Sequence, residues 1–281
     1  MALAERAPVH VINADSRQVY RGMSMGTAKP TPDEQAAVPH HLIDVVDPSG
    51  GYSLAAFLSQ ARAAIDEALG LGVLPVVVGG TGQYVWGLAE GWRAPEVPPH
   101  AELRARLERE AAERGAPALH ARLSRVDADA AASIDPRNVR RVVRALEVWQ
   151  VTGKRFSSLR KKGEVPFEPR LFGIDVERGE LRARIDARVD GMIARGWVEE
   201  VRALVEAGYG PELPAFSAAG YRELAAHLRG EVTLEEAVAS AKKATHRLAR
   251  SQANWFRRSD PRITWVAGGG ELVREVLRAL A

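Results

Sequence analysis

The densest group of polar side chains lies at 15–30, directly after the apolar run 9–12. Its first residue, Asp15, carries a carboxylate that can accept a proton from a reacting group. The next three side chains offer hydrogen-bond donors beside it: Ser16, Arg17 and Gln18. An isolated aspartate after a strand commonly caps the following turn, so Asp15 alone leaves a catalytic and a structural role open.

A second group with chemical potential is the glycine turn Gly79-Gly80-Thr81-Gly82, which follows the apolar run 73–78. Glycine lets the backbone approach a ligand closely, and Thr81 adds a hydroxyl. The same four residues would also form an ordinary turn between a strand and a helix, so the turn alone is a weak signal.

Basic side chains gather on two predicted helix faces. Between Arg137 and Lys162 the only acid is Glu147. Helical spacing places four arginines on one face: Arg137, Arg140, Arg141 and Arg144. A similar face near the end of the chain carries Lys243, Arg247, Arg250 and Arg257, against Leu248 and Trp255. Both faces could contact phosphates, and both could equally be solvated surface.

The elements that must position these residues predict an α/β fold. Val9–Ile12 and Val73–Val78 have the pattern of buried parallel strands, and the helical pattern 54–69 between them ends at Gly70 and Gly72. Strand, helix, strand and glycine turn in this order are typical of a parallel sheet. Residues 1–6 have the pattern of a helix end that Pro8 breaks.

The middle of the chain predicts a helical insertion. Three prolines interrupt 94–99, and a long helical stretch follows over 101–149. A strand at 170–176 then returns to the sheet, before long helices at 178–207 and 234–258 and a last strand at 263–266. We therefore predict a first part of the α/β core at 1–95, a helical insertion domain at 96–168 and completion of the core at 169–281.

Composition excludes several classes of protein. The chain of 281 residues has no cysteine, which rules out disulfides, cysteine-ligated zinc and a thiolate nucleophile. No apolar run approaches the ~20 residues that a membrane span needs, so we expect no membrane partner and a cytoplasmic location. The net charge of +3 is too small to indicate a polyanion partner by itself.

The polar segment also carries a family resemblance. Asp15–Pro30 is similar to the signature DSRQVYRGMDIGTAKP of tRNA dimethylallyltransferases, with Ser24 where that family usually has an acid. Further ordered matches to the family are Pro39–Asp44, Gly79–Tyr84, Arg140–Val148 and Gly220–Glu223. Together the matches extend from about Val9 to Arg258.

The resemblance implies a fold and a reaction. The expected fold is a parallel-sheet core like that of the P-loop NTPases, with an inserted helical domain. The expected reaction transfers a dimethylallyl group from dimethylallyl diphosphate to N6 of adenine 37, beside the anticodon of tRNA, and releases diphosphate. Mg²⁺ is the expected cofactor, with no ligands assigned, and we expect a monomer that binds the anticodon stem-loop.

The resemblance also assigns residues. Asp15 corresponds to the general base and Thr81 to a threonine beside the reacting centre. The expected diphosphate and prenyl site is Gly79, Gly80 and Thr81. The residues expected to contact tRNA are Ser16, Arg17, Gln18, Arg104, Arg140, Arg141, Arg144 and Arg247. Met23 and Met25 fit either the prenyl channel or, more simply, the core.

The chain departs from the family where the P-loop is expected. No G-x-x-x-x-G-K-[ST] motif occurs in the sequence, although the family uses one to hold the diphosphate. We therefore expect a truncated or mis-called N-terminus and an inactive or impaired enzyme. Ser217 and Ser251 replace residues that relatives often have as Gln or Arg.

Two other functions remain possible from the sequence. One is a small-molecule kinase or nucleotide prenyltransferase that shares the P-loop core, although a basic helical insertion would serve it little. The other is a non-catalytic tRNA-binding remnant, for which tRNA binding would be salt-sensitive and Asp15 dispensable.

Overall fold

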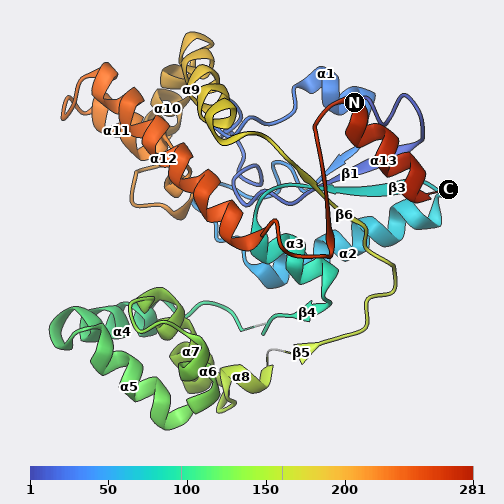
Figure 1. The fold of residues 1–281 in the computed structure, drawn as a ribbon. Helices are drawn as coiled ribbons and strands as arrows, with labels where there is room; N and C mark the ends of the chain where they lie inside the picture. Colours follow the sequence, from blue (N-terminus) through green and yellow to red (C-terminus); the bar gives the residue numbers. More distant parts are fainter. Residues whose placement is uncertain (96, 160, 281) are drawn as a thin grey trace. The chain divides into compact units, whose positions relative to one another are not determined.

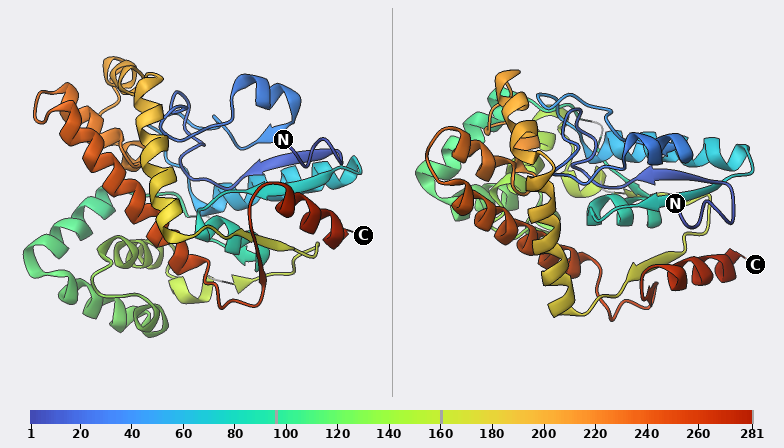
Figure 2. Two further views of the ribbon diagram at one scale, coloured as in Figure 1. Left: turned by 45° about the horizontal axis from the view of Figure 1, so that its top comes forward. Right: turned by 90° about the horizontal axis from the view of Figure 1, so that it is seen from above.

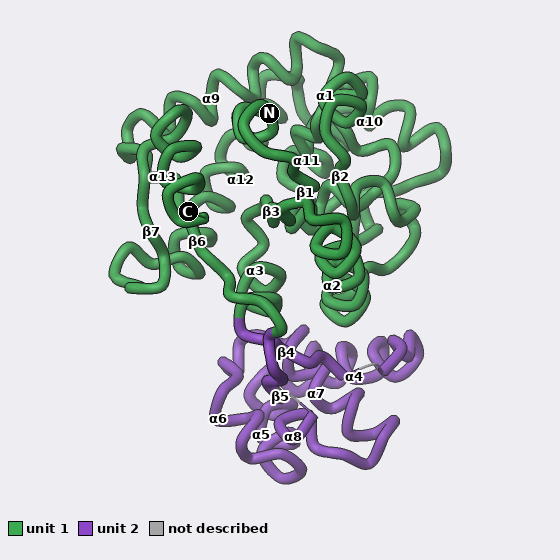
Figure 3. Tube along the Cα trace, turned by 90° about the vertical axis from the view of Figure 1, so that its right-hand side faces the viewer, with its two compact units in different colours: residues 1–89, 166–281 green, residues 90–165 purple. Residues whose placement is uncertain are grey.

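The computed structural model describes residues 1–95, 97–159 and 161–280. Within it the chain forms two compact units, which Figure 3 shows in different colours. The core unit comprises residues 1–89 and 166–281, and the insertion unit comprises residues 90–165. The boundaries expected from sequence, at 95 and 168, lie within a few residues of these limits, and the functional assignment of the domains stays a prediction.

The core unit is built on a parallel sheet of three strands (Figure 1). β1 (Val9–Asn13) is central, and β2 (His40–His41) and β3 (Leu74–Val78) flank it. The register of β1 on β3 runs from Val9 opposite Leu74 to Asn13 opposite Val78. The two strands therefore end together, and the loops that follow them start at the same edge of the sheet. The predicted α/β fold with a parallel sheet is confirmed.

Helix α2 (Leu54–Gly70) connects the flanking strands and packs on the sheet. Ser53 caps it by accepting a hydrogen bond from the backbone N–H of Ala56, and its buried face repeats at helical spacing from Phe57 to Ala68. The chain leaves the helix at Gly72, which has a φ of 68°. The short helices α1 (Pro32–Ala37) and α3 (Gly82–Ala89) precede β2 and follow β3.

A helical layer completes the core unit (Figure 2). Its elements are α9 (Arg178–Ala194), α10 (Trp197–Glu206), the 3₁₀ turn η1 (Pro214–Ser217), α11 (Tyr221–Leu228) and α12 (Leu234–Trp255). The predicted single helix over 178–207 is wrong, because Gly196 has a φ of 102° and separates α9 from α10. Trp197, Phe216 and Tyr221 are fully buried in a cluster that also contains Met23, which is therefore a core residue.

The last strands form a sheet of their own. β6 (Leu171–Ile174) pairs in parallel with β7 (Ile263–Val266), and α13 (Gly270–Leu280) packs near them. The strand predicted to return to the first sheet thus pairs only with β7 among the described residues. β3 likewise has β1 as its only neighbour there, which leaves Val77 and Val78 exposed and contradicts the prediction of a fully buried strand. Residues 1–6 form turns and not a helix end.

The insertion unit is a small helical bundle. Its helices are α4 (Ala101–Arg114), α5 (Ala116–Val126), α6 (Ala128–Ser133), α7 (Val139–Thr152) and α8 (Phe156–Leu159). Leu107, Leu119, Leu123 and Leu146 are fully buried at its centre. The antiparallel strands β4 (Trp92–Arg93) and β5 (Lys161–Lys162) pair where the chain enters and leaves the unit. No described helix in either unit is long and apolar enough to cross a membrane.

Candidate active site at the ends of two parallel strands

The site begins where β1 and β3 end side by side. The backbone N–H of Ala14 donates to the carbonyl oxygen of Val78 at 2.7 Å, which extends the pairing past the last strand residue. A Cβ atom on Gly79 would lie 2.2 Å from the carbonyl carbon of Ala14. Backbone cannot yield to such a contact, so only glycine allows the turn after β3 to approach the loop after β1 this closely.

Thr81 joins the two loops. Its backbone N–H donates to the carbonyl oxygen of Ala14 at 3.2 Å, and its Oγ1 accepts the backbone N–H of Ser16 at 3.0 Å. The same hydroxyl lies 3.2 Å from the Oγ atom of Ser16. Residues 65 positions apart are thereby brought into one site, with Asp15 between the two backbone groups that Thr81 contacts.

Asp15 is held at the centre of a compact turn. Its Oδ1 accepts the backbone N–H of Arg17 at 2.7 Å, so the capping role open at the sequence level is present. Asn13 also stabilises the turn, because its Oδ1 accepts the backbone N–H of Asp15 at 2.9 Å. Its Nδ2 donates to the carbonyl oxygen of Leu42 at 2.9 Å, which fixes the Asn13 side chain. Sequence reasoning did not single out Asn13, although a polar residue at the end of a buried strand is the signal that marks it.

Burial raises the pKa of Asp15, and the backbone N–H groups of Arg17 and Gln18 and the charge of Arg17 offset this only in part. Because the charged form is disfavoured, the carboxylate is a stronger proton acceptor than an ordinary surface aspartate. The turn thus fixes the position of the Asp15 carboxylate, and the carboxylate still keeps a raised affinity for a proton.

The other residues of the signature are fixed by neighbours. The guanidinium of Arg17 donates through Nη1 to the carbonyl oxygen of Pro214 at 3.1 Å. The Nε2 of Gln18 donates to the carbonyl oxygens of Thr27 and Ala28 at 3.0 and 3.2 Å. Both side chains remain partly exposed beside Asp15.

The end of α12 packs against the glycine turn, which the sequence did not predict. A Cβ atom on Gly80 would lie 2.0 Å from Nε2 of Gln252, and one on Gly82 would lie 2.2 Å from the ring of Trp255. Trp86 secures this end of the helix by donating its indole N–H to the carbonyl oxygen of Trp255 at 3.0 Å. The only signal in the sequence was the run of glycines, which indicates that another part of the protein or a ligand lies close to this backbone but does not identify it.

The basic face of α12 is exposed at Arg247, as it is at Lys243 and Arg250, whereas Arg257 is exposed but lies beyond the helix, which ends at Trp255 and not at 258 as predicted. Leu248, expected to pack on the opposite side, is also 48% exposed. The helix is held by its buried residues Ala237 and Ala241 and by polar contacts with α9, where His246 lies 2.8 Å from Asp186 and Lys242 lies 2.7 Å from Asp190. The predicted division into basic and packed faces is therefore only partly realised.

In the insertion unit the arginines do not form the uniform basic face that the sequence predicts, because some of them bond to a buried carboxylate. Glu147 is fully buried and accepts two hydrogen bonds from Arg104, at 2.7 and 2.9 Å, and one from Arg144 at 2.5 Å. The backbone N–H of His100 adds another at 2.7 Å. Burial alone would raise the pKa of Glu147, but these donors together bring it below its ordinary value. Arg104 and Arg144 are thus engaged inside the unit, whereas Arg140 is exposed.

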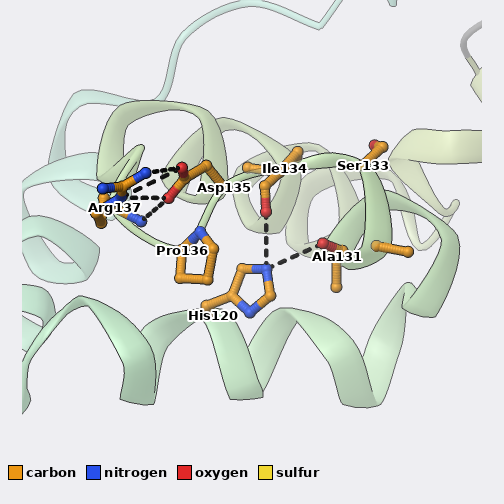
Figure 4. A pocket seen from close by; sticks show the side chains of 8 residues that line it. His120, Ala131, Ser133, Ile134, Asp135, Pro136 and Arg137 are labelled. Atoms are coloured by element: carbon orange, nitrogen blue, oxygen red, sulfur yellow. Dashed lines mark hydrogen bonds and ion pairs between the residues drawn. The ribbon is translucent and has the colours of Figure 1, made fainter.

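A pocket of about 570 Å³ lies elsewhere in the insertion unit (Figure 4). His120 points into it, with Nε2 3.0 Å from the carbonyl oxygens of both Ala131 and Ile134, and an ion pair between Asp135 and Arg137 borders it. This pocket is an open hollow between α5 and the segment after α6, and none of the residues assigned from sequence to catalysis lines it.

The described residues contain no group of three or more His, Asp or Glu side chains that could hold a metal ion. The hydrogen bonds join the hydroxyls of Thr81 and Ser16, and Asp15, the residue before Ser16, carries a carboxylate. This set does not fit a protein-built magnesium site, which needs near-octahedral oxygen coordination.

Comparison with known proteins identifies the family. The IPP transferase family model matches residues 18–259. A tRNA dimethylallyltransferase of Roseiflexus sp. is 49% identical over 97% of this chain and 90% of its own length. One of Thermomicrobium roseum is 51% identical over 88% of this chain and 75% of its own.

Solved structures agree. A tRNA isopentenylpyrophosphate transferase of Bacillus halodurans has a TM-score of 0.70 and 38% identity, over 99% of this chain and 89% of its own. A eukaryotic dimethylallyltransferase, solved acting on tRNA, has a TM-score of 0.78 and 27% identity, over 99% of this chain and 73% of its own. The chain therefore belongs to the IPP transferase family and is an enzyme, a transferase.

Proposed function

We propose that the protein transfers a dimethylallyl group from dimethylallyl diphosphate to N6 of adenine 37, next to the anticodon of tRNA. Its relatives are tRNA dimethylallyltransferases, and the site offers one basic carboxylate beside a hydroxyl and a glycine turn. The observation that carries the proposal is the bond from the Ser16 backbone to Thr81, which holds Asp15 beside the turn after β3.

Asp15 is the general base in this proposal. The lone pair of an adenine exocyclic amine is delocalised into the ring, so the amine is a poor nucleophile until a proton is removed. As N6 forms its bond to C1 of the allyl group, the C1–oxygen bond breaks and its electron pair leaves with the diphosphate. The proton lost by N6 goes to the Asp15 carboxylate, whose raised pKa suits it to receive that proton.

The glycine turn receives the leaving group. Gly79 and Gly80 contribute backbone to this proposed diphosphate site, and the hydroxyl hydrogen of Thr81 can turn from Ser16 towards a diphosphate oxygen. Fixed donors at this point favour departure because they meet the charge as it develops. Mg²⁺ remains an expectation of the family, and no step here depends on it.

For RNA recognition we propose that Ser16, Arg17 and Gln18 contact the adenine after it has left the stack of the anticodon loop. Arg140, Arg141 and Arg247 then contact phosphates, in line with the exposure of Arg140 and Arg247. Arg104 and Arg144 contribute mainly by forming the network around Glu147. A monomeric state and a cytoplasmic location stay predictions.

The test is Asp15→Asn, assayed with a labelled prenyl donor and an anticodon stem-loop RNA. The substitution keeps an oxygen for the Arg17 N–H but removes the base, so we expect turnover to fall by at least about 100-fold. RNA affinity should stay within about threefold of wild type, as should both quantities for the exposed control Asp33→Asn. Equal loss of turnover and affinity would show that Asp15 is structural.

The expectation that this chain is impaired rests on the missing G-x-x-x-x-G-K-[ST] motif alone. It is not confirmed by the comparisons, since a relative aligns over 97% of the chain. The decisive measurement is single-turnover prenylation by the 281-residue chain, and a rate equal to that of the Bacillus halodurans relative would contradict the expectation.

A further inference from the structure

The carboxylate of Glu200, on the first turn of α10, receives three successive backbone N–H groups from another part of the chain. Oε2 accepts from Ser24 at 2.8 Å and from Met25 at 2.6 Å, and Oε1 accepts from Gly26 at 3.3 Å. Consecutive N–H groups that converge on one anion form a nest, and charge-assisted bonds of this kind are stronger than neutral ones. Glu200 therefore fixes the backbone of the loop 24–26.

Two buried aromatic residues prevent this loop from shifting. Tyr221 donates its hydroxyl to Oε1 of Glu200 at 2.6 Å, and it is completely buried. The ring of Trp197 fills the space beside the loop, since a Cβ atom on Gly26 would lie 2.0 Å from its Nε1. The same ring would lie 2.1 Å from a Cβ atom on Gly220. Loop, α10 and the start of α11 are thus held together at one point.

The fixed loop in turn holds Gln18. The carbonyl oxygens of Thr27 and Ala28, directly after the nest, each accept a hydrogen bond from the Gln18 amide. Thr27 is itself tied to the loop by its hydroxyl, which donates to the carbonyl oxygen of Met23 at 2.5 Å. Ala28 has a φ of 53°, an uncommon backbone conformation for alanine that aims its carbonyl at Gln18.

We infer that Glu200 is a positioning residue for RNA recognition, which acts by fixing the loop whose carbonyl oxygens orient Gln18 beside Asp15. The inference rests on the proposed function, in which Gln18 contacts the nucleotide to be modified. The Glu200 carboxylate acts through the backbone N–H groups of the loop 24–26 that it accepts. Its carboxylate suits the task because it is only an acceptor, whereas an amide in its place would turn an NH₂ group towards at least one of the four donors.

The experiment is a double-mutant cycle with Glu200→Gln and Gln18→Ala, measured as the affinity for a fluorescently labelled anticodon stem-loop RNA at fixed salt. We expect each single substitution to weaken binding by roughly 5- to 10-fold, the order of one hydrogen-bonding group lost. If Glu200 acts through Gln18, the double variant should bind no more weakly than Gln18→Ala alone. Binding is the readout because it does not depend on turnover.

Glu199→Gln is the matched control. Glu199 precedes Glu200 on the same helical turn, but its side chain is 66% exposed and forms a long ion pair of 3.8 Å with Arg202. Its loss should therefore leave the RNA affinity unchanged. If Glu200→Gln does not fold, Tyr221→Phe replaces it in the cycle. That change removes one donor, keeps the three backbone bonds and should give a smaller loss that again disappears when Gln18 is absent.

The possible outcomes distinguish a failure of the inference about Glu200 from a failure of the proposed contact between Gln18 and RNA. Independent losses that multiply in the double variant would overturn the inference, since Glu200 would then affect binding by a route other than Gln18, while the contact of Gln18 with RNA would stand. Full affinity of Gln18→Ala would remove Gln18 from the RNA site, and both the contact and the inference would fall together.

Discussion

Asp15 in the core unit and Glu147 in the insertion unit are two carboxylates that both accept backbone N–H groups and lie beside arginine, and they have opposite character. Asp15, in the core unit, has a raised pKa because burial outweighs the backbone N–H groups and the charge of Arg17. Glu147, in the insertion unit, is fully buried and yet has a lowered pKa, because two arginines and a backbone N–H together outweigh burial.

The difference shows that proximity to arginine in the sequence does not decide what a carboxylate does. Glu147 has its oxygens saturated by donors, which makes it a structural centre that cannot easily take up a proton. Asp15 receives bonds that fix its position without saturating it, which preserves basicity. A site for proton transfer needs the second arrangement and a stable helical bundle needs the first.

The largest effect that would test this comparison is on folding. Glu147→Gln replaces a buried charge that compensates Arg104 and Arg144, and we expect it to destabilise the protein by about 2–4 kcal/mol. The guanidinium groups are partly exposed, which keeps the cost below that of two fully buried charges. Chemical denaturation measures it, with the exposed Glu102→Gln as the control. A loss below about 0.5 kcal/mol would mean that Glu147 is no more than a surface ion pair.

A second, smaller effect should separate the arginines. Arg104→Ala is expected to cost about 1–2 kcal/mol of stability, since it removes two of the bonds to Glu147. Arg140→Ala should leave stability unchanged, but weaken RNA binding a few-fold and lower the slope of affinity against salt by about one. Thermal melts and a salt titration of stem-loop binding measure the two quantities. The reverse pattern would make Arg104 the phosphate contact and Arg140 the structural residue.

The smallest effect is on the stability of the Asp15 and Glu147 variants relative to wild type, which should have opposite signs for the two residues and should depend on pH. A raised folded pKa means that Asp15 lowers stability at neutral pH, so Asp15→Asn should melt slightly higher than wild type at pH 7. This gain should fade as the pH falls through the folded pKa of Asp15, because the wild-type carboxyl is then neutral.

The lowered pKa of Glu147 has the opposite consequence. Its contribution is present above the ordinary glutamate pKa and is lost as the pH falls through the folded value, so the penalty of Glu147→Gln should shrink in acid. Melting curves of both variants from pH 7 to about 3, which extends below the ordinary pKa of both carboxyl groups, provide the comparison. Parallel curves of the same sign would contradict the assignment of opposite pKa shifts.

Much of the fold followed from local pattern. The strand at 263–266 and the helix from Leu54 were predictable because periodicity and β-branched runs act within a few residues. The parallel pairing of the first strands was predictable from the order strand, helix, strand. The break at Gly196 was harder to predict, because glycine is tolerated inside helices and only its φ of 102° ends one here. The separate pairing of β6 and β7 depends on contacts between segments far apart in the chain.

The site divides in the same way. The sequence by itself determined which residues could react, since the types and order around Asp15 and the glycine turn define the chemistry and resemble one family. Only the tertiary structure decided which charges stay available. Glu147 engages Arg104 from 43 positions away, Thr81 meets Ser16 across 65, and Glu200 holds a loop more than 170 positions before it. Hydrogen bonds and burial depend on distance in space, and a linear pattern does not record that distance.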